Sequence, residues 1–239
     1  MSTELPSRPA PLILAAPSGT GKTTIAHALV DRFDHFVFSV SVTTRPRRGH
    51  ERDGVDYEFV SEAAFRELID EGELVEWAQV HGNFYGTPRR NLEAARDEGL
   101  HPVLDIDVQG AMQIRERIPE ALLVFIFPPG AADLRTRLTA RGTERPEEVR
   151  RRLAAAGEEL ALSRTFDYIV VNDHLERAVD RVRQIVETEG HRPSRTLDLA
   201  AEVARIRGEI DAVVGDLDGD ARASGMPSVA VRLSKEDVT

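Results

Sequence analysis

A glycine-rich segment near the N-terminus has the residue types that bind phosphate. Pro17-Ser-Gly-Thr-Gly-Lys-Thr-Thr24 follows the apolar run Leu12–Ala16 and precedes a stretch with apolar residues at helical spacing. Strand, glycine-rich turn and helix form the context in which backbone N–H groups and a helix N-terminus surround a phosphate. We expect Lys22 to reach the β- and γ-phosphates of a nucleoside triphosphate, and the Thr23 hydroxyl to bind Mg²⁺.

This segment departs from the usual G-x-x-x-x-G-K-[ST] pattern at Ala16, which replaces the first glycine. Alanine is tolerated where φ is negative, so we expect the loop to keep its shape. Lys22 and Lys235 are the only lysines among 31 basic residues, which indicates that position 22 needs a compact point charge. The competing interpretation, an ordinary Gly/Ser turn, is disfavoured by this lysine and by the preceding strand. The expected ATP-binding residues of the loop are Ala16, Pro17, Ser18, Gly19, Thr20, Gly21, Lys22, Thr23 and Thr24.

A second candidate phosphate site is a cluster of arginines in an otherwise acidic protein. Ser39–Arg48 ends a strand in a hydroxyl-rich turn, and Arg45, Arg47, Arg48 and Arg52 follow closely. Guanidinium groups match phosphate oxygens in pairs, so this cluster suits a monophosphate. Taken alone, a solvated loop would be the better interpretation of these arginines.

The order of elements predicts an α/β fold with a mostly parallel central sheet flanked by helices. Short β-branched runs alternate with longer amphipathic stretches, which is the pattern of βαβ units. The expected strands are Leu12–Ala16, Phe36–Ser41, Leu74–Val80, Val103–Asp107, Leu122–Phe127 and Tyr168–Val171. The expected helices are Lys22–Phe33, Ser61–Glu71, Arg89–Glu98, Val108–Arg117, Ala131–Arg141, Pro146–Ser163 and Leu175–Glu187.

The composition favours a cytoplasmic globular protein. Its 239 residues suffice for one substantial core with an appendage. Cysteine is absent, so disulfides and thiolate metal sites are excluded. The longest apolar run, Ala121–Phe127, falls short of the ~20 residues that a membrane helix needs. A net charge of −10 argues against nucleic-acid binding.

Four further motifs, taken together, resemble the guanylate kinase family. In chain order they are S-V-S-x-T-T-R-x-x-R from Ser39, E-W-A-x-x-H-G-N-x-Y-G-T from Glu76, L-D-I-D-x-Q-G-A from Leu104 and R-G-T-E from Arg141. The similarity covers roughly Leu12 to Glu187. It implies a P-loop nucleoside-monophosphate-kinase fold over residues 1–189, with an acceptor-binding subdomain at about 39–93 and a lid at about 137–157. Residues 190–239 lie outside it.

The resemblance implies a reaction, ATP-dependent phosphorylation of GMP, and a set of acceptor contacts. Guanine presents N1–H and N2–H₂ as donors beside the O6 acceptor, so a carboxylate such as Glu76 suits it. Adenine has the opposite polarity and leaves that carboxylate unpaired. An outward charge on a half-buried strand is the alternative for Glu76. The implied GMP phosphate contacts are Arg45, Arg48, Tyr57 and Tyr85, and the implied guanine contacts are Ser41, Glu76, Thr87 and Asp107.

The resemblance also assigns residues to catalysis and to the donor side. Phosphoryl transfer needs charge stabilisation and positioning rather than a protein nucleophile. The implied catalytic residues are Lys22, Arg45, Arg137, Arg141 and Arg152, and Asn172 resembles the adenine-side contact. Asp105 and Asp107 end a buried strand, and the sequence does not rank these two acids for the metal; Asp105 with Thr23 is the candidate set for the Mg²⁺ that accompanies ATP. No tightly bound organic cofactor is expected.

Several other functions are weighed against this one. GTP switches need an Asn-Lys-x-Asp motif, which neither lysine provides. A non-catalytic guanylate-kinase-like module that binds protein ligands is the alternative from another class, but such modules tend to lose the P-loop lysine. An adenylate-type kinase is opposed by Glu76. The histidines at 81, 101 and 174 lack metal-ligand spacing and are interpreted as structural.

The C-terminal extension has a different character. His191–Arg195 is a polar break, and Leu199, Val203, Ile206, Ile210 and Val213 then recur at alternating spacings of four and three. A helix docked on its own core is the favoured interpretation, and a homodimer contact is the alternative. Asp216, Asp218 and Asp220 imitate a calcium loop, but Ala221 and Pro227 stand where glycine and glutamate are required.

Overall fold

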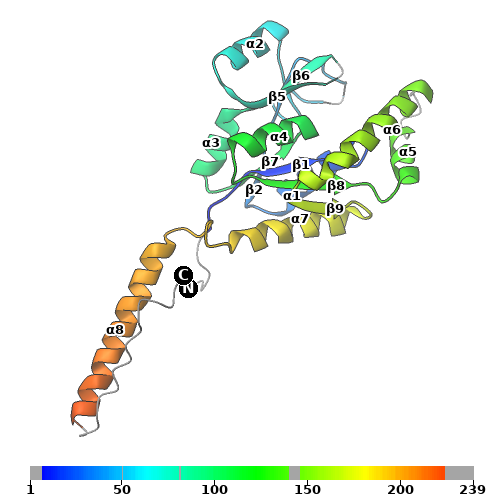
Figure 1. The fold of residues 1–239 in the computed structure, drawn as a ribbon. Coiled ribbons are helices and arrows are strands. Elements are labelled where there is room, and N and C mark those ends of the chain that lie inside the picture. Colours follow the sequence, from blue (N-terminus) through cyan, green and yellow to red (C-terminus); the bar gives the residue numbers. More distant parts are fainter. Residues whose placement is uncertain (1–6, 50, 81, 140–145, 224–239) are drawn as a thin grey trace. The chain divides into compact units, whose positions relative to one another are not determined.

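The computed structural model describes residues 7–49, 51–80, 82–139 and 146–223 (Figure 1). The chain divides into two compact units. One comprises Ser7–Arg195, and the other contains the described residues from Thr196 onward. Within the described part, no helix is both long and apolar enough to cross a membrane.

The larger unit is built on a five-stranded parallel sheet with the order β2-β7-β1-β8-β9. Along β1, Leu12 and Leu14 pack into one apolar cluster while Ile13 and Ala15 pack into another. Both faces of this strand are therefore buried, as expected where helices cover both sides of a parallel sheet. The strands are β1 (Leu12–Ala15), β2 (Phe36–Phe38), β7 (His101–Asp105), β8 (Leu122–Phe127) and β9 (Tyr168–Val171).

Helices cover the two faces of this sheet, and together they confirm the predicted α/β fold class (Figure 1). Buried residues of α1 (Lys22–Arg32) and α7 (Leu175–Gly190) share a cluster with Leu12 and Leu14. Buried residues of α4 (Val108–Arg117) pack with Ile13 and Ala15 on the other face.

A smaller four-stranded sheet, with the order β4-β3-β6-β5, carries the acceptor-side residues. Helix α2 (Glu62–Asp70) begins at Ser61, whose hydroxyl accepts a hydrogen bond from the Ala64 amide at 3.2 Å. It buries Phe65 against Val42 and Leu74. The elements are β3 (Val42–Thr43), β4 (Glu58–Phe59), β5 (Leu74–Val80), β6 (Asn83–Pro88) and the following helix α3 (Arg89–Asp97).

Two helices form the region predicted to be a lid. Helix α5 (Ala131–Thr139) and helix α6 (Pro146–Ala161) pack through Leu134, Leu138 and Ala156. Arg141, one of the predicted catalytic residues, lies outside the described residues.

Most predicted elements are confirmed, but several boundaries are wrong. The strand predicted at Phe36–Ser41 ends at Phe38, and the one predicted at Val103–Asp107 is β7, His101–Asp105. Strand β7 ends at Asp105, before the predicted end at Asp107, because Asp107 accepts a hydrogen bond from the Gly110 amide and caps α4. The helix predicted at Pro146–Ser163 ends at Ala161, where the chain tightens into the 3₁₀ helix η1 (Leu162–Thr165).

Strands β3, β4 and β6 were absent from the sequence prediction. Strands β3 and β4 are only two residues long, too short for any alternating pattern. Strand β6 contains Asn83, Gly86 and Pro88, three residue types that are depleted in strands. Its stability comes from pairing with β5 and β3.

The second unit contains one long helix, α8 (Leu199–Ala223), of 25 residues. The predicted apolar stripe lies within it, and the calcium-loop imitation at 216–220 also falls in this helix.

Candidate functional site

The glycine-rich loop joins the carboxyl end of β1 to the start of α1. Gly19 and Gly21 have φ values of 86° and 92°, a left-handed conformation that side chains rarely adopt. Thr20 is fully buried, and its hydroxyl donates to the Pro17 carbonyl at 2.7 Å. Among described non-glycine residues only Asp198 has positive φ, so Ala16 occupies ordinary backbone, as its replacement of glycine requires.

Two predicted donor-side residues brace this loop. The Asn172 side-chain amide donates to the Thr20 carbonyl at 2.7 Å, and the Arg137 guanidinium donates to the same oxygen at 2.8 Å. Arg137 also donates to the Asn172 carbonyl at 3.0 Å. The space is tight, because a Cβ on Gly21 would lie 2.6 Å from the Asn172 amide nitrogen. The loop shape is therefore fixed by side chains more than 100 residues away in sequence.

Arg152, from α6, also reaches the phosphate loop. Its guanidinium donates to the Ser18 hydroxyl at 2.6 Å. Of the three arginines predicted at the lid, the structure brings Arg137 and Arg152 to the loop.

The loop's lysine and threonine meet an acidic residue from the neighbouring strand. Lys22 Nζ lies 2.8 Å from Asp105 Oδ1 and also donates to the Ile106 carbonyl. The Thr23 hydroxyl donates to the other oxygen of Asp105. The β1–β7 register pairs Leu14 with Asp105, which places this carboxylate beside the loop.

The chemistry of this cluster fits Mg²⁺. A carboxylate and a hydroxyl are hard oxygen ligands, the type that Mg²⁺ takes alongside substrate phosphates. Asp105 touches Thr23, whereas the side chain of Asp107 caps α4. The structure therefore separates the two acids that sequence alone left equivalent. The described residues contain no group of three or more His, Cys, Asp or Glu side chains able to hold a metal ion.

On the acceptor side, Arg45 is held by a buried acid that the sequence prediction missed. Its guanidinium donates to the two oxygens of Glu51 at 2.8 and 3.0 Å. The Arg48 amide donates to the same carboxylate at 2.8 Å. Burial opposes ionisation, but the hydrogen bonds from Arg45 and Arg48 hold the pKa of Glu51 below its ordinary value. The sequence did offer a signal for Glu51, because it is the only acidic residue between Arg45 and Arg52.

Two tyrosines stand beside this arginine. The Arg45 guanidinium lies 5.3 Å from the centroid of the Tyr57 ring, and the Tyr57 and Tyr85 rings are 6.0 Å apart. Burial is the main cause that raises the pKa of Tyr57 to about 12, and the nearby Asp105 carboxylate adds to the rise. The Tyr57 hydroxyl therefore remains a hydrogen-bond donor at neutral pH. Arg45, Tyr57 and Tyr85 thus lie together, while the Arg48 residue is exposed.

A buried carboxylate occupies the position predicted for guanine recognition. Glu76 is 3% exposed, so the alternative of an outward charge is wrong. It lies opposite Thr87 in the β5–β6 pairing, and the Thr87 hydroxyl donates to it at 2.6 Å. A Cβ on Gly110 would lie 2.5 Å from Glu76 Oε2, so the first turn of α4 approaches closely.

The environment of Glu76 favours its neutral form. Burial raises its pKa to about 7, against the Thr87 hydrogen bond, and the Asp107 carboxylate adds to the rise. Ser41, the remaining predicted guanine contact, is also buried. The site thus holds a carboxylate that is harder to ionise than an exposed glutamate, and further hydrogen-bond donors or positive charge would favour its ionised form.

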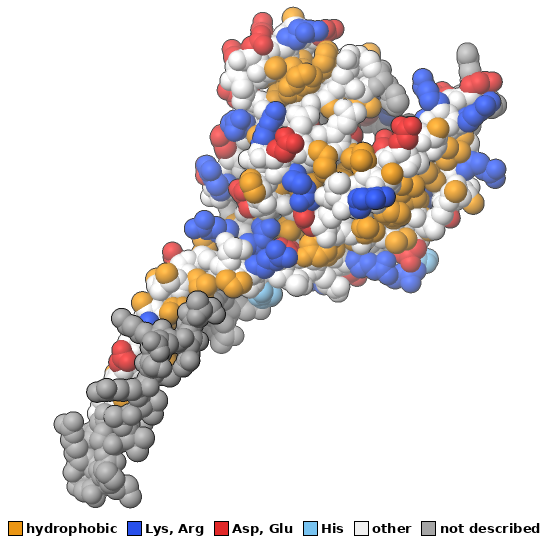
Figure 2. All heavy atoms as spheres, in the orientation of Figure 1, with side chains coloured by type: hydrophobic (Ala, Val, Ile, Leu, Met, Phe, Trp, Pro, Cys, Tyr) orange, Lys and Arg blue, Asp and Glu red, His pale blue; other side chains and the backbone are white. Residues whose placement is uncertain are grey.

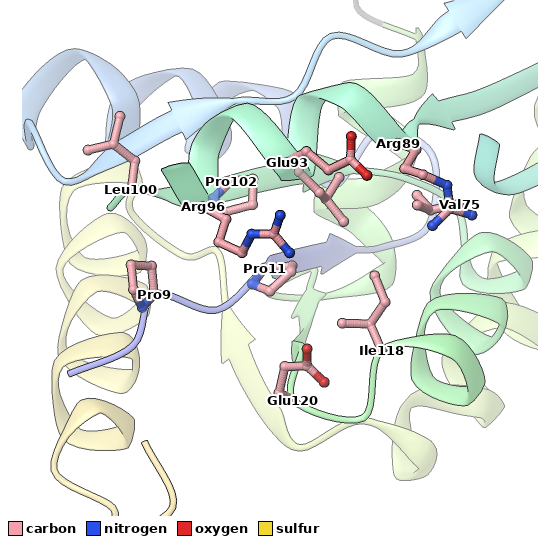
Figure 3. A pocket seen from close by; sticks show the side chains of 11 residues that line it. Pro9, Pro11, Val75, Arg89, Glu93, Arg96, Leu100, Pro102, Ile118 and Glu120 are labelled. Carbon is pink, nitrogen blue, oxygen red and sulfur yellow. The ribbon is translucent and has the colours of Figure 1, made fainter. Parts of the chain in front are cut away.

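A separate cavity contains none of the predicted site residues (Figure 3). Its volume is about 200 Å³, and Pro11, Pro102 and Glu120 line it. These residues lie before or near the amino ends of β1, β7 and β8, whereas ligands of open α/β sheets bind at the carboxyl ends. The phosphate loop lies at that carboxyl end.

A family profile described as "Guanylate kinase" matches residues 8–189. The chain belongs to the guanylate kinase family. It is 45% identical over 190 residues to a guanylate kinase of Geobacter metallireducens, and the aligned region covers 80% of this chain and 94% of that protein. It is 52% identical over 172 residues to one from Nitratidesulfovibrio vulgaris, covering 72% and 83%. A crystal structure of guanylate kinase from Anaplasma phagocytophilum matches with a TM-score of 0.70 and 36% identity, covering 82% of this chain and 94% of that one.

Membership in this family confirms the function predicted from the motifs. The chain is an ATP-dependent kinase that phosphorylates GMP to GDP. The profile ends at residue 189, close to the end of α7 at Gly190, and α8 lies beyond it.

Proposed function

We propose that the chain transfers the γ-phosphoryl group of ATP to GMP through a donor site around Lys22 and an acceptor site around Glu76. The observation that carries this division is the buried Glu76–Thr87 pair, because phosphate loops are common to many nucleotide enzymes and this pair is not. Its charge and polarity match guanine.

Guanine binding would occur through the ionised form of Glu76. The carboxylate accepts hydrogen bonds from guanine N1–H and N2–H₂, and the hydroxyls of Ser41 and Thr87 complete the polar lining. Asp107, whose carboxylate raises the pKa of Glu76, is the fourth proposed guanine contact. Because burial disfavours this charge in the free protein, the donors on guanine supply the partners that the carboxylate lacks. AMP would leave it unpaired.

The GMP phosphate would be held by Arg45, Arg48, Tyr57 and Tyr85. Glu51 positions Arg45 through two hydrogen bonds, so the guanidinium is oriented before the phosphate arrives. This preorganisation lowers the entropy lost when the acceptor binds.

The donor side would use backbone and side chains together. The amides of residues 16–24 bind the ATP phosphates, and Lys22 moves from Asp105 to the β- and γ-phosphates. Thr23 and Asp105 would hold Mg²⁺, which neutralises developing charge on the phosphate oxygens when bound. Arg137 and Arg152, with Arg141, supply positive charge to the transferring group. Asn172 keeps Thr20 in place and lies on the adenine side.

The remaining assignments follow the same proposal. ATP and GMP are the partners, with no nucleic acid or membrane, and the protein works in the cytoplasm. Residues 1–189 form the catalytic domain, with the acceptor region at about 39–93 and the lid at about 137–157. Residues 190–239 form an extension.

The decisive experiment measures Mg²⁺-dependent transfer from ATP to GMP beside AMP, CMP and UMP. We expect ADP and GDP to form with GMP and the other acceptors to be poor. Transfer to AMP in preference to GMP would overturn the role of Glu76 while keeping the donor site. No transfer to any acceptor, in protein shown to be folded, would favour a binding module instead.

A further inference from the structure

Helix α8 presents an apolar stripe that the described residues leave exposed. Val203, Ile206, Ile210 and Val213 are 47, 43, 54 and 57% exposed. With Leu199 they alternate at spacings of four and three residues, the 3.5-residue repeat of a coiled-coil seam. In that repeat Val203 and Ile210 occupy a positions, and Leu199, Ile206 and Val213 occupy d positions. Figure 2 shows hydrophobic side chains along the described part of this helix.

The helix also contains residues that weaken it in isolation. Gly208 and Gly215 lie inside it, and each costs about 0.5–1 kcal/mol relative to alanine. Both fall at f positions, on the side away from the seam. Most helix stability in proteins comes from packing of an apolar face, so a helix with this composition requires a partner along the stripe.

The charges beside the seam select the partner and its direction. Glu202 and Glu209 occupy g positions on one flank, and Arg207 occupies an e position on the other. Arg205, at a c position, donates to both glutamates and holds them on their flank. In the described part of the chain, Arg207 has no ion pair.

We propose that α8 pairs in parallel with α8 of a second copy of this chain, forming a two-stranded coiled coil. In a parallel pair each g residue faces the partner's e residue in the next heptad, which brings Glu202 to the partner's Arg207. In an antiparallel pair g faces g, so glutamates would oppose glutamates. β-Branched residues at a positions favour two strands. The mixture of acidic and basic residues on the polar face is unsuited to an anionic membrane.

The first test is the mass of the full-length chain by sedimentation equilibrium over a wide concentration range. We expect a reversible monomer–dimer equilibrium. Ile206→Glu with Ile210→Glu should weaken the dimer by about 100-fold or more, because two charges enter the seam. Ala201→Glu adds a charge at an f position and serves as the matched control, with the wild-type dimer expected. Retained kinase activity shows that the catalytic unit of each variant is folded.

A second test fixes the direction. The chain has no cysteine, so Val213→Cys introduces a unique thiol at a d position. In a parallel dimer the two thiols meet and mild oxidation gives a covalent dimer. In an antiparallel pair residue 213 would face the region of residue 203, about 15 Å along the helix, and no disulfide forms. Ala201→Cys, on the outer side, should remain uncrosslinked.

Charge exchange supplies a third test. Glu202→Arg and Arg207→Glu should each weaken self-association, since like charges then face each other across the seam. Mixing the two variants should restore a heterodimer, because both interhelical pairs become attractive. A wild-type chain that stays monomeric at every concentration would assign the stripe to its own chain and overturn the proposal. So would a dimer that survives the double glutamate variant, or one without a Val213→Cys crosslink.

Discussion

The glycine-rich loop at residues 16–24 and the buried cluster around Glu76 differ in the atoms that we propose would face the ligand. The loop is one continuous stretch of chain with two left-handed glycines, and its backbone amides are the proposed phosphate contacts. The cluster around Glu76 is made of side chains from separate strands, with Glu76 and Thr87 joined by an antiparallel pairing. Backbone amides would accept the phosphate chain of any nucleoside triphosphate, whereas in our proposal the side chains around Glu76 would discriminate between bases. On this proposal the loop would serve phosphoryl transfer, and the cluster around Glu76 would select the acceptor base.

The energetic costs of the two regions also differ. The loop has a well-satisfied carbonyl at Thr20, which accepts hydrogen bonds from the side chains of Asn172 and Arg137. The cluster around Glu76 instead keeps a carboxylate at 3% exposure with its pKa raised to about 7. Burying a charged acid destabilises the free protein, and we propose that guanine would offset that cost by donating hydrogen bonds to Glu76.

The largest expected effect comes from the donor side. Replacing Lys22 by alanine should lower kcat by about 10³-fold, since it removes a charge that stabilises the transition state. GMP affinity should change little, which calorimetry with GMP alone would check. Lys235→Ala removes the other lysine and is the matched control. Equal losses in both variants would remove the basis for a donor role of Lys22.

The acceptor side should respond differently. Replacing Glu76 by glutamine should lower kcat/KM for GMP by roughly 10²- to 10³-fold, because an amide nitrogen would face guanine's donors. The KM for ATP should stay near its wild-type value. Steady-state kinetics with GMP and AMP provide the measurement. An unchanged preference for GMP would place base recognition elsewhere.

A third substitution tests whether the loop depends on the side chains behind it. Replacing Gly21 by alanine strains a residue with φ of 92° and sets Cβ 2.6 Å from the Asn172 amide. We expect kcat/KM for ATP to fall by about 10²-fold, because the loop shifts from its working geometry. Gly54→Ala is the matched control, since Gly54 has φ of 71° but open space around it. It should cost about 1 kcal/mol of stability and leave ATP use intact.

The smallest effect concerns stability and pH. Because the folded-state pKa of Glu76 is about 7, above its ordinary value of 4.5, the carboxyl contributes stability at low pH that is lost as pH rises through 7. Without ligand, Glu76→Gln should therefore gain about 2 kcal/mol relative to wild type between pH 5 and pH 8. Denaturant unfolding at the two pH values measures it. A constant difference would mean that the pKa of Glu76 is not raised in the folded protein, which would contradict the prediction.

Much of the fold follows from local pattern. The strands Leu74–Val80, Leu122–Phe127 and Tyr168–Val171 and the helix Val108–Arg117 match their predicted bounds because apolar residues recur at strand or helix spacing. The phosphate loop was equally accessible, since its glycines, lysine and flanking elements are contiguous. Helix α8 was also foreseen from its stripe, although the pattern alone did not choose between a core contact and a dimer.

What the tertiary structure decided are contacts between residues far apart in the chain. It assigned Asp105 rather than Asp107 to Thr23, because β7 lies beside β1 and Asp107 caps the next helix. It found Glu51 under Arg45, where a run of charges had looked solvated. It placed the Glu76 carboxylate against Gly110 in a buried position, where burial raises its pKa to about 7. Sequence spacing carries local geometry and residue chemistry, but burial and charge pairing depend on which distant segments fold against each other.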